Sequence, residues 1–118
     1  MIARTWRGWT ARVDADAYTE YVERTGMAAY RSTPGNLGAY LLRRDDGDRT
    51  EFMTFSLWES MAAVRVFAGD EPERAVFYPE DDRFLVDRET SVTHFEALTD
   101  DRARDSHGRG RASRERPR

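Results

Sequence analysis

The segment from Thr50 to Ser60, with the sequence Thr-Glu-Phe-Met-Thr-Phe-Ser-Leu-Trp-Glu-Ser, restricts the possible folds more than any other part of the chain. Met53, Phe55 and Leu57 occupy alternate positions. An apolar row with a period of two predicts a strand that packs against a hydrophobic layer. We therefore expect this face of the strand to belong to the core.

The other face of the same strand mixes aromatic rings with hydroxyl groups, at Phe52, Thr54, Ser56 and Trp58. Such a mixture suits neither water nor a dry core, and it is typical of a cavity wall that holds a partly polar guest. A tryptophan at a strand end also serves simply as packing, because its large apolar surface is stabilising wherever it is covered. Ser60 directly precedes Met61, where its side chain can cap a helix.

The composition excludes several kinds of chemistry. The chain has 118 residues and 39% hydrophobic content, which is enough for one modest core and a single domain. It has no Cys, and all 19 basic residues are Arg. Disulfides, cysteine-based zinc sites, thiol nucleophiles, Schiff-base lysines and a P-loop lysine are therefore absent. The use of Arg in place of Lys would also follow from the codon composition of a GC-rich bacterium.

Charge divides the chain into two parts. Residues 1–98 hold 12 Arg against 18 Asp and Glu, a net charge of −6, whereas residues 99–118 hold 7 against 4, a net charge of +3. No large apolar residue follows Leu98, so we expect residues 99–118 to be a disordered tail and residues 1–98 to be the folded domain. The acidic body opposes nucleic-acid binding. No membrane span or signal pattern is evident, so we expect a cytoplasmic protein.

The rest of the sequence divides into strands and helices. Alternation predicts strands at residues 2–9, 36–44 and 92–98, and Asp45 to Asp48 predict a hairpin turn before the Thr50 strand. Helical spacing predicts an amphipathic helix after Asp14, in which Gly26 marks a kink or an early end. A further helix is expected at residues 61–68, and a shorter one after residue 70. The connection that begins there is long enough to fold over another part of the molecule.

This order predicts an α+β fold of the ferredoxin-like, split βαβ type (βαββαβ), with both helices on one face of a four-stranded antiparallel sheet. We expect the other face to carry Trp6, Tyr40, Phe52 and Trp58. A monomer of this size rarely exposes so much aromatic surface, so we expect another surface to cover it. A second copy packed sheet on sheet would supply it, making a homodimer that closes a barrel around a cavity.

The order of elements, the Pro34-Gly35 turn, the hairpin and Trp58-Glu59-Ser60 running into a helix resemble the antibiotic biosynthesis monooxygenase family of dimeric α/β barrels. The resemblance covers about residues 1–98. It implies oxidation of an aromatic phenol or anthrone to a quinone without any cofactor, in a cavity within each subunit. It also implies that Trp58 matches a tryptophan that positions substrate and oxygen. The family's asparagine four residues earlier is Thr54 here, and residues 61–68 lack the histidine of the haem-degrading branch.

His94 is the candidate general base, because a neutral imidazole can take a phenolic proton near pH 7. It can equally be a strand histidine that is hydrogen-bonded to a neighbour. Trp58 and Trp6 can stack a flat ligand or fill a core, and Tyr40 can donate to a ligand oxygen. Arg4 and Arg7 can anchor a carboxylate, although arginines that face water are the commoner case. The remaining candidate substrate contacts are Phe52, Thr54 and Ser56.

Two functions follow from these residues. The first is a small monooxygenase-like enzyme that oxidises a small aromatic ligand. The second is a non-catalytic, dimeric ligand-binding or accessory protein of the same fold. The absence of the family's asparagine favours the second function, whereas the mixed aromatic and polar lining together with His94 favours the first.

Overall fold

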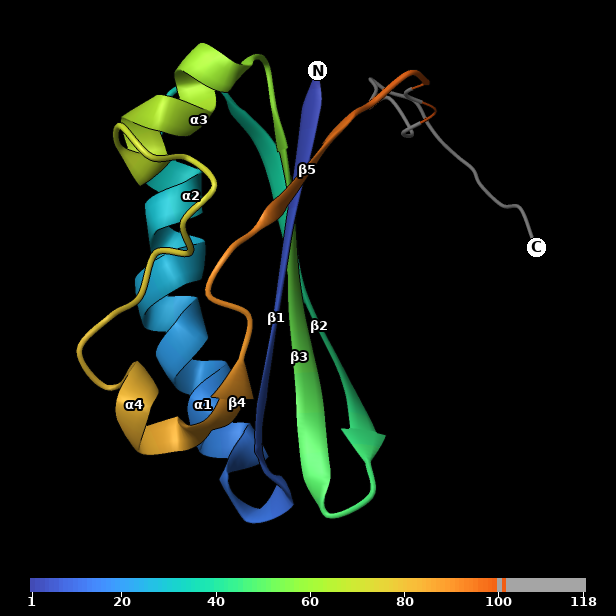
Figure 1. Cartoon of the computed structure of the whole chain (residues 1–118), viewed down its shortest axis with the longest axis vertical. Coiled ribbons are helices and arrows are strands. Elements are labelled where there is room, and N and C mark those ends of the chain that lie inside the picture. Colours follow the sequence, from blue (N-terminus) through green and yellow to red (C-terminus); the bar gives the residue numbers. More distant parts are fainter. Residues whose placement is uncertain (100, 102–118) are drawn as a thin grey trace, which may run out of the picture.

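The computed structural model describes residues 1–99 and 101 of the chain (Figure 1). It has the predicted α+β, ferredoxin-like architecture, in which an antiparallel sheet is covered on one face by helices. The strands are β1 (Ile2–Ala11), β2 (Asn36–Asp46), β3 (Arg49–Trp58), β4 (Leu85–Arg88) and β5 (Thr93–Glu96). The helices are α1 (Ala15–Val22), α2 (Ala28–Ser32), α3 (Met61–Ala68) and α4 (Asp81–Phe84). The expected tail, residues 99–118, lies almost wholly outside the described residues.

The sheet has the order β2-β3-β1-β4, and β5 also pairs with β1. β4 lies against Gly8 to Thr10, and β5 lies against Ile2 to Thr5, so two short strands share one edge of β1. β5 is shorter than the strand predicted at residues 92–98. β4 is a strand that the sequence analysis did not predict. Phe84, Leu85 and Val86 form a short apolar run between charged residues, and this run shows no alternation that would indicate a strand.

α1 and α2 form one continuous helical stretch across the sheet, joined by a π-helical turn at Glu23–Met27. Gly26 lies within that turn, so the helix is widened there and does not end early. The buried side of the stretch carries Tyr18, Tyr21 and Val22, as the helical spacing predicts.

α3 begins and ends as the sequence indicates. The Ser60 hydroxyl accepts a hydrogen bond from the Ala63 N–H at 3.2 Å, which confirms the predicted cap. The start of β2 packs closely against this helix, since a Cβ on Gly35 would lie 2.5 Å from the Ala63 Cβ. Gly35 also has a φ of +88°, a conformation that favours glycine.

The prediction of a short helix after Asp70 was wrong. Residues 69–80 form an irregular segment that is tied to the β4–β5 connection by backbone hydrogen bonds, from Val92 N–H to the Glu73 carbonyl and from Ala75 N–H to the Thr90 carbonyl. These partners hold the chain extended, and an isolated bridge joins Arg74 to Ser91. The apolar residues of the segment cover the space between the helices and the sheet, so the segment does fold over something.

The two faces of β3 are the reverse of the prediction. Phe52, Thr54, Ser56 and Trp58 face the helices and are buried, whereas Met53, Phe55 and Leu57 are half-buried on the open face. The hydroxyls tolerate burial because they find partners: Trp58 Nε1 donates to Ser56 Oγ at 2.9 Å. Trp6, Phe52 and Trp58 therefore do not lie on the open face, where the sequence analysis placed them.

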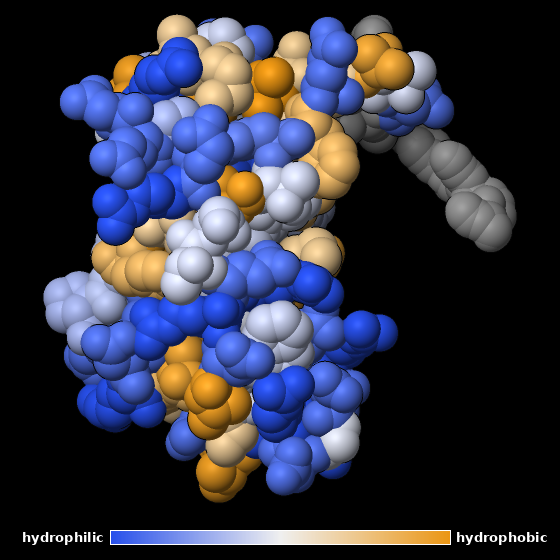
Figure 2. Space-filling model, in the orientation of Figure 1, coloured by the Kyte–Doolittle hydropathy of each residue, from blue (hydrophilic) through white to orange (hydrophobic). Residues whose placement is uncertain are grey.

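The open face of the sheet carries the apolar row of β3 together with exposed side chains of its neighbours, Tyr40, Leu42 and Phe95. Figure 2 shows that hydrophilic side chains cover most of the molecule in an edge-on view, with apolar patches between them. No helix in the described residues is long and apolar enough to cross a membrane.

Candidate functional site

A small, partly open cavity lies between the sheet and the helices, and residues 75–78 line its outer side. Six of the fifteen residues that line it are aromatic. Its volume is about 50 Å³. Since one water needs roughly 10–15 Å³ by this measure, the cavity has room for a few water molecules. The lining residues that matter below are Arg4, Trp6, Tyr30, Thr54, Tyr78 and Asp81.

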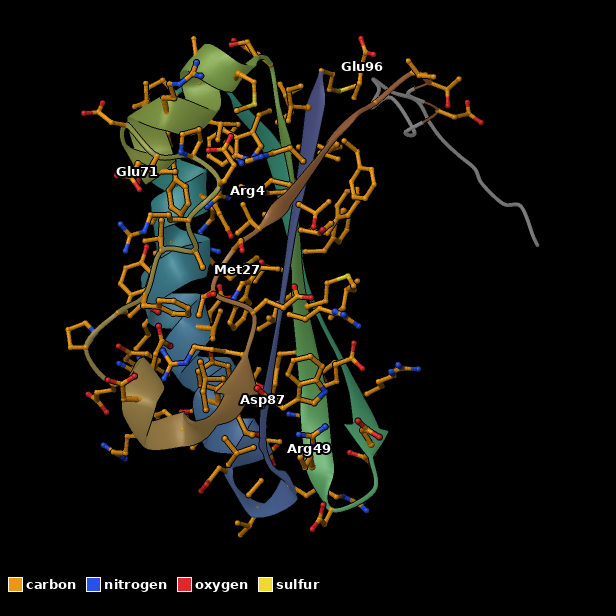
Figure 3. The ribbon with its side chains drawn as sticks, in the orientation of Figure 1. Arg4, Met27, Arg49, Glu71, Asp87 and Glu96 are labelled. Carbon is orange, nitrogen blue, oxygen red and sulfur yellow. The ribbon has the colours of Figure 1, made fainter. Side chains whose placement is uncertain are left out.

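Arg4 is the most unusual residue of the cavity wall. It lies on β1 opposite Ser56 and His94, and it points from the sheet towards the helices (Figure 3). Only 3% of its surface is exposed. Its Nη1 donates to the Pro72 carbonyl at 2.6 Å, and its Nη2 donates to the Arg74 carbonyl at 3.3 Å. The guanidinium also lies over the ring of Phe67, 5.6 Å from its centroid.

No carboxylate of the described residues lies within 4 Å of the Arg4 guanidinium. Burial lowers the pKa of Arg4, and the opposing charges of Tyr30 and Glu73 do not offset it. An arginine nevertheless stays protonated in a protein. The cavity wall therefore contains a buried positive charge whose hydrogen-bond partners are backbone carbonyls and an imidazole.

His94 lies behind Arg4 and is not part of the cavity wall. Its Nε2 is 3.0 Å from Arg4 Nη1, and because a guanidinium can only donate, Nε2 must be the acceptor. Burial, and to a lesser degree the charge of Arg4, lower the pKa of His94. The imidazole is therefore neutral at pH 7, and the lone pair of its Nε2 already accepts the hydrogen bond from Arg4.

A buried carboxylate lies at another part of the wall, where α4 packs against α1 (Figure 1). Asp81 accepts a hydrogen bond from the Tyr18 hydroxyl at 3.2 Å and another from the Tyr78 backbone N–H at 2.6 Å. Burial raises the pKa of Asp81, and burial next to this carboxylate also raises the pKa of Tyr18. The cavity thus offers a cation at one place and a proton acceptor at another.

The structure distributes the predicted site residues among three environments. Trp6 and Thr54 line the cavity. Tyr40 is exposed on the open face of the sheet, with 56% of its surface accessible. The others lie behind the wall and do not line the cavity: Phe52, Ser56, Trp58 and His94.

Sequence reasoning missed several wall residues. The sequence analysis gave Arg4 as a possible carboxylate anchor but favoured a position facing water, and alternation alone does not show that an arginine is buried. The signal that could have indicated its burial was its position on the same face of the strand as Trp6. Asp81 was hidden within an acidic run, Glu80-Asp81-Asp82, of which only the middle residue is buried.

The sequence profile of the antibiotic biosynthesis monooxygenase family matches residues 9–75, more than half of the chain. This chain belongs to the antibiotic biosynthesis monooxygenase family. A search of curated protein sequences found no match.

Solved structures of similar fold include several related proteins. Rv0793 of Mycobacterium tuberculosis has 20% sequence identity and a TM-score of 0.59, over 86% of this chain and 98% of that one. SnoaB, a cofactor-independent oxygenase from Streptomyces nogalater, has 19% identity and a TM-score of 0.55, over 84% and 95%. A variant of MhuD with two manganese protoporphyrin IX molecules per active site has 23% identity and a TM-score of 0.56, over 87% and 100%. At these identities the similarity establishes the fold.

Proposed function

We propose that this antibiotic biosynthesis monooxygenase family member is a small, cofactor-independent monooxygenase-like enzyme that oxidises an aromatic phenol or anthrone in the cavity beneath the helices. The observation that carries the proposal is the aromatic-walled cavity that holds both a buried cation, Arg4, and a buried proton acceptor, Asp81. An anthrone would lose two hydrogens and gain one oxygen atom from O₂, and the other oxygen atom would leave as water. We also propose that the protein works in the cytoplasm of a bacterium.

Several chain residues can contribute to this reaction. Trp6 and Thr54 would contact the substrate directly, since both line the cavity. Asp81 is placed to take the substrate proton, and its raised pKa makes it a stronger base than an ordinary carboxylate. His94 would take the proton only after Arg4 releases its Nε2. Trp58 would act from behind the wall, by fixing the rings of Tyr30 and Phe67.

The cavity is too small for such a substrate. Binding sites for drug-sized ligands measure about 300–1,000 Å³, against about 50 Å³ here. The outer wall is the segment 69–80, which has no regular helix or strand of its own. We therefore expect this segment to move outward when the substrate binds.

We further propose that two copies pair through the open faces of their sheets and form the dimeric barrel. The apolar row Met53, Phe55 and Leu57 runs along the middle of that face, flanked by exposed Tyr40 and Leu42. Apolar surface of this kind is favourable to bury. Light scattering at micromolar concentration should give twice the chain mass of 13.7 kDa. Phe55→Glu should yield monomers, whereas Val66→Glu on the exposed side of α3 should not. A wild-type mass of 13.7 kDa would refute the dimer.

Oxygen uptake with a panel of anthrones and phenols tests the proposed reaction. Wild-type protein should consume oxygen, and Asp81→Asn should lower kcat by about 10²-fold or more while still binding substrate, as expected on loss of a general base. His94→Ala separates the two candidate bases, because a larger loss of kcat in this variant than in Asp81→Asn would assign the proton transfer to His94. Glu80→Gln, an exposed neighbour, is the control.

The second candidate function is a non-catalytic ligand binder, and Thr54 in place of the family's asparagine favours it. Wild-type protein that binds the panel with a change in tryptophan fluorescence but consumes no oxygen would select this alternative.

A further inference from the structure

We infer that Arg4 is an anchor for an anionic oxygen of the ligand, a carboxylate or an ionised phenol, and that this group binds the free N–H donors of Arg4 and competes for those that now hold backbone carbonyls. The inference rests on the proposed function for the location of the ligand. It does not depend on catalysis, because a non-catalytic binder would use the same anchor.

Burial of an unpaired charge costs free energy. A buried guanidinium is destabilising unless it is paired or fully hydrogen-bonded. Arg4 is 97% buried, yet it has no carboxylate partner among the described residues. Arg7, on the same strand but the opposite face, donates through both Nε and Nη2 to Glu89. The half-exposed Arg7 thus has a carboxylate partner, whereas the buried Arg4 has none among the described residues.

The hydrogen bonds of Arg4 leave donors available. A guanidinium has five N–H groups, and three of those of Arg4 are used, by Pro72, Arg74 and His94. Arg4 is also part of the cavity wall. Arginine presents two parallel N–H groups in a planar fork that matches a carboxylate, and a charged acceptor binds more strongly there than a neutral carbonyl.

The surroundings of Arg4 favour an aromatic acid over a small inorganic anion. Trp6, Tyr30 and Phe67 supply rings around the cavity beside the guanidinium. Asp81 contributes a carboxylate elsewhere in the same wall, and it would repel a second negative group but accept a hydrogen bond from a neutral hydroxyl. The ligand class is therefore a planar aromatic molecule with one acidic oxygen, directed to Arg4, and at most neutral polar groups near Asp81.

The same contacts connect ligand binding to the cavity wall. The carbonyls that Arg4 holds belong to Pro72 and Arg74, which lie in the irregular segment 69–80 directly before the cavity-lining residues 75–78. A ligand anion that takes over these donors would remove two of the hydrogen bonds that fix the segment. The cavity would widen as the acidic group binds.

Equilibrium binding with a matched pair of probes tests the inference. The probes are 2-naphthoate, which is ionised at pH 7, and 2-naphthamide, which has nearly the same shape but no charge. Wild-type protein should bind the naphthoate roughly tenfold to a hundredfold more tightly, the range expected for a hydrogen bond to a charged group. Arg4→Gln should bring the two affinities to within about threefold of each other. Arg7→Gln should leave the wild-type ratio unchanged.

Arg4→Lys keeps the positive charge without the fork, so it should give an intermediate ratio and also serves if Arg4→Gln does not fold. Equal wild-type affinities, an unchanged ratio in a folded Arg4 variant, or no binding of either probe at millimolar concentration would each overturn the inference. Discrimination between the probes without oxygen uptake on the anthrone panel would refute the proposed enzyme and leave the anchor standing. Oxygen uptake without discrimination would do the reverse.

Discussion

Trp58 provides the sharpest test of how the sheet and helices are packed. Its side chain is fully buried, its ring lies 6.1 Å from that of Tyr30 and 5.6 Å from that of Phe67, and its Nε1 donates to Ser56 Oγ. About 200 Å² of buried ring at about 25 cal/mol per Å² corresponds to roughly 5 kcal/mol. Trp58→Ala should therefore lower the free energy of unfolding by about 3–5 kcal/mol, the usual cost of such a truncation.

Trp58→Phe separates the hydrogen bond from the packing. This variant keeps a ring but loses the donor to Ser56 Oγ, so it should cost roughly 1–2 kcal/mol. In a double-mutant cycle with Ser56→Ala, the coupling energy between the two positions should be about 1 kcal/mol.

Denaturant unfolding, followed by circular dichroism at one fixed protein concentration, measures all of these values. A loss below about 1 kcal/mol for Trp58→Ala would refute the reasoning, because a side chain that simply faced a ligand cavity would behave in that way.

Two further predictions concern a tight turn and a half-buried histidine. Gly35→Ala should destabilise the protein by more than about 1 kcal/mol, because it adds a Cβ that would lie 2.5 Å from the Ala63 Cβ at a positive φ. Gly47→Ala, at a positive φ with no atom within 4 Å, should cost less in the same thermal unfolding assay, and equal losses would contradict the close packing. For His94, the lowered pKa means that the unfolded chain binds a proton at higher pH than the folded protein does, so the free energy of unfolding should fall as the pH drops below about 6.5. His94→Gln should make this fall smaller between pH 7 and 5, and an unchanged pH profile would argue against a half-buried, neutral imidazole.

The sequence predicted the fold because local signals and the global plan agree in most of the chain. The helical spacing of Tyr18, Tyr21 and Val22, the Ser60 cap and the apolar alternation of β3 each correspond to an observed element. The pattern could not determine which face of β3 meets the helices. Both faces contain large apolar residues, and the face of Ser56 is compatible with burial because its hydroxyl finds partners in the folded chain.

The site was predicted less well than the fold, for a physical reason. Alternation assigns a residue to a strand face, but it does not reveal whether a charged residue on that face is buried. Arg4 and Asp81 are stabilised by backbone groups of Pro72, Arg74 and Tyr78, all of which belong to the irregular segment. Because that segment follows no periodic pattern, the sequence gives no register from which those contacts could be inferred.

The central claim is that the ligand binds beneath the helices and not on the open face of the sheet. The chain has three tryptophans in three environments: Trp6 lines the cavity, Trp9 lies on the open face, stacked against Arg7 and Arg49, and Trp58 is buried in the core. A fluorescence titration with 2-naphthoate should therefore quench wild-type protein and Trp9→Phe to a similar extent, whereas Trp6→Phe should lose most of the quenching. Loss of the signal in Trp9→Phe, with Trp6→Phe unaffected, would place the ligand on the open face and contradict the account.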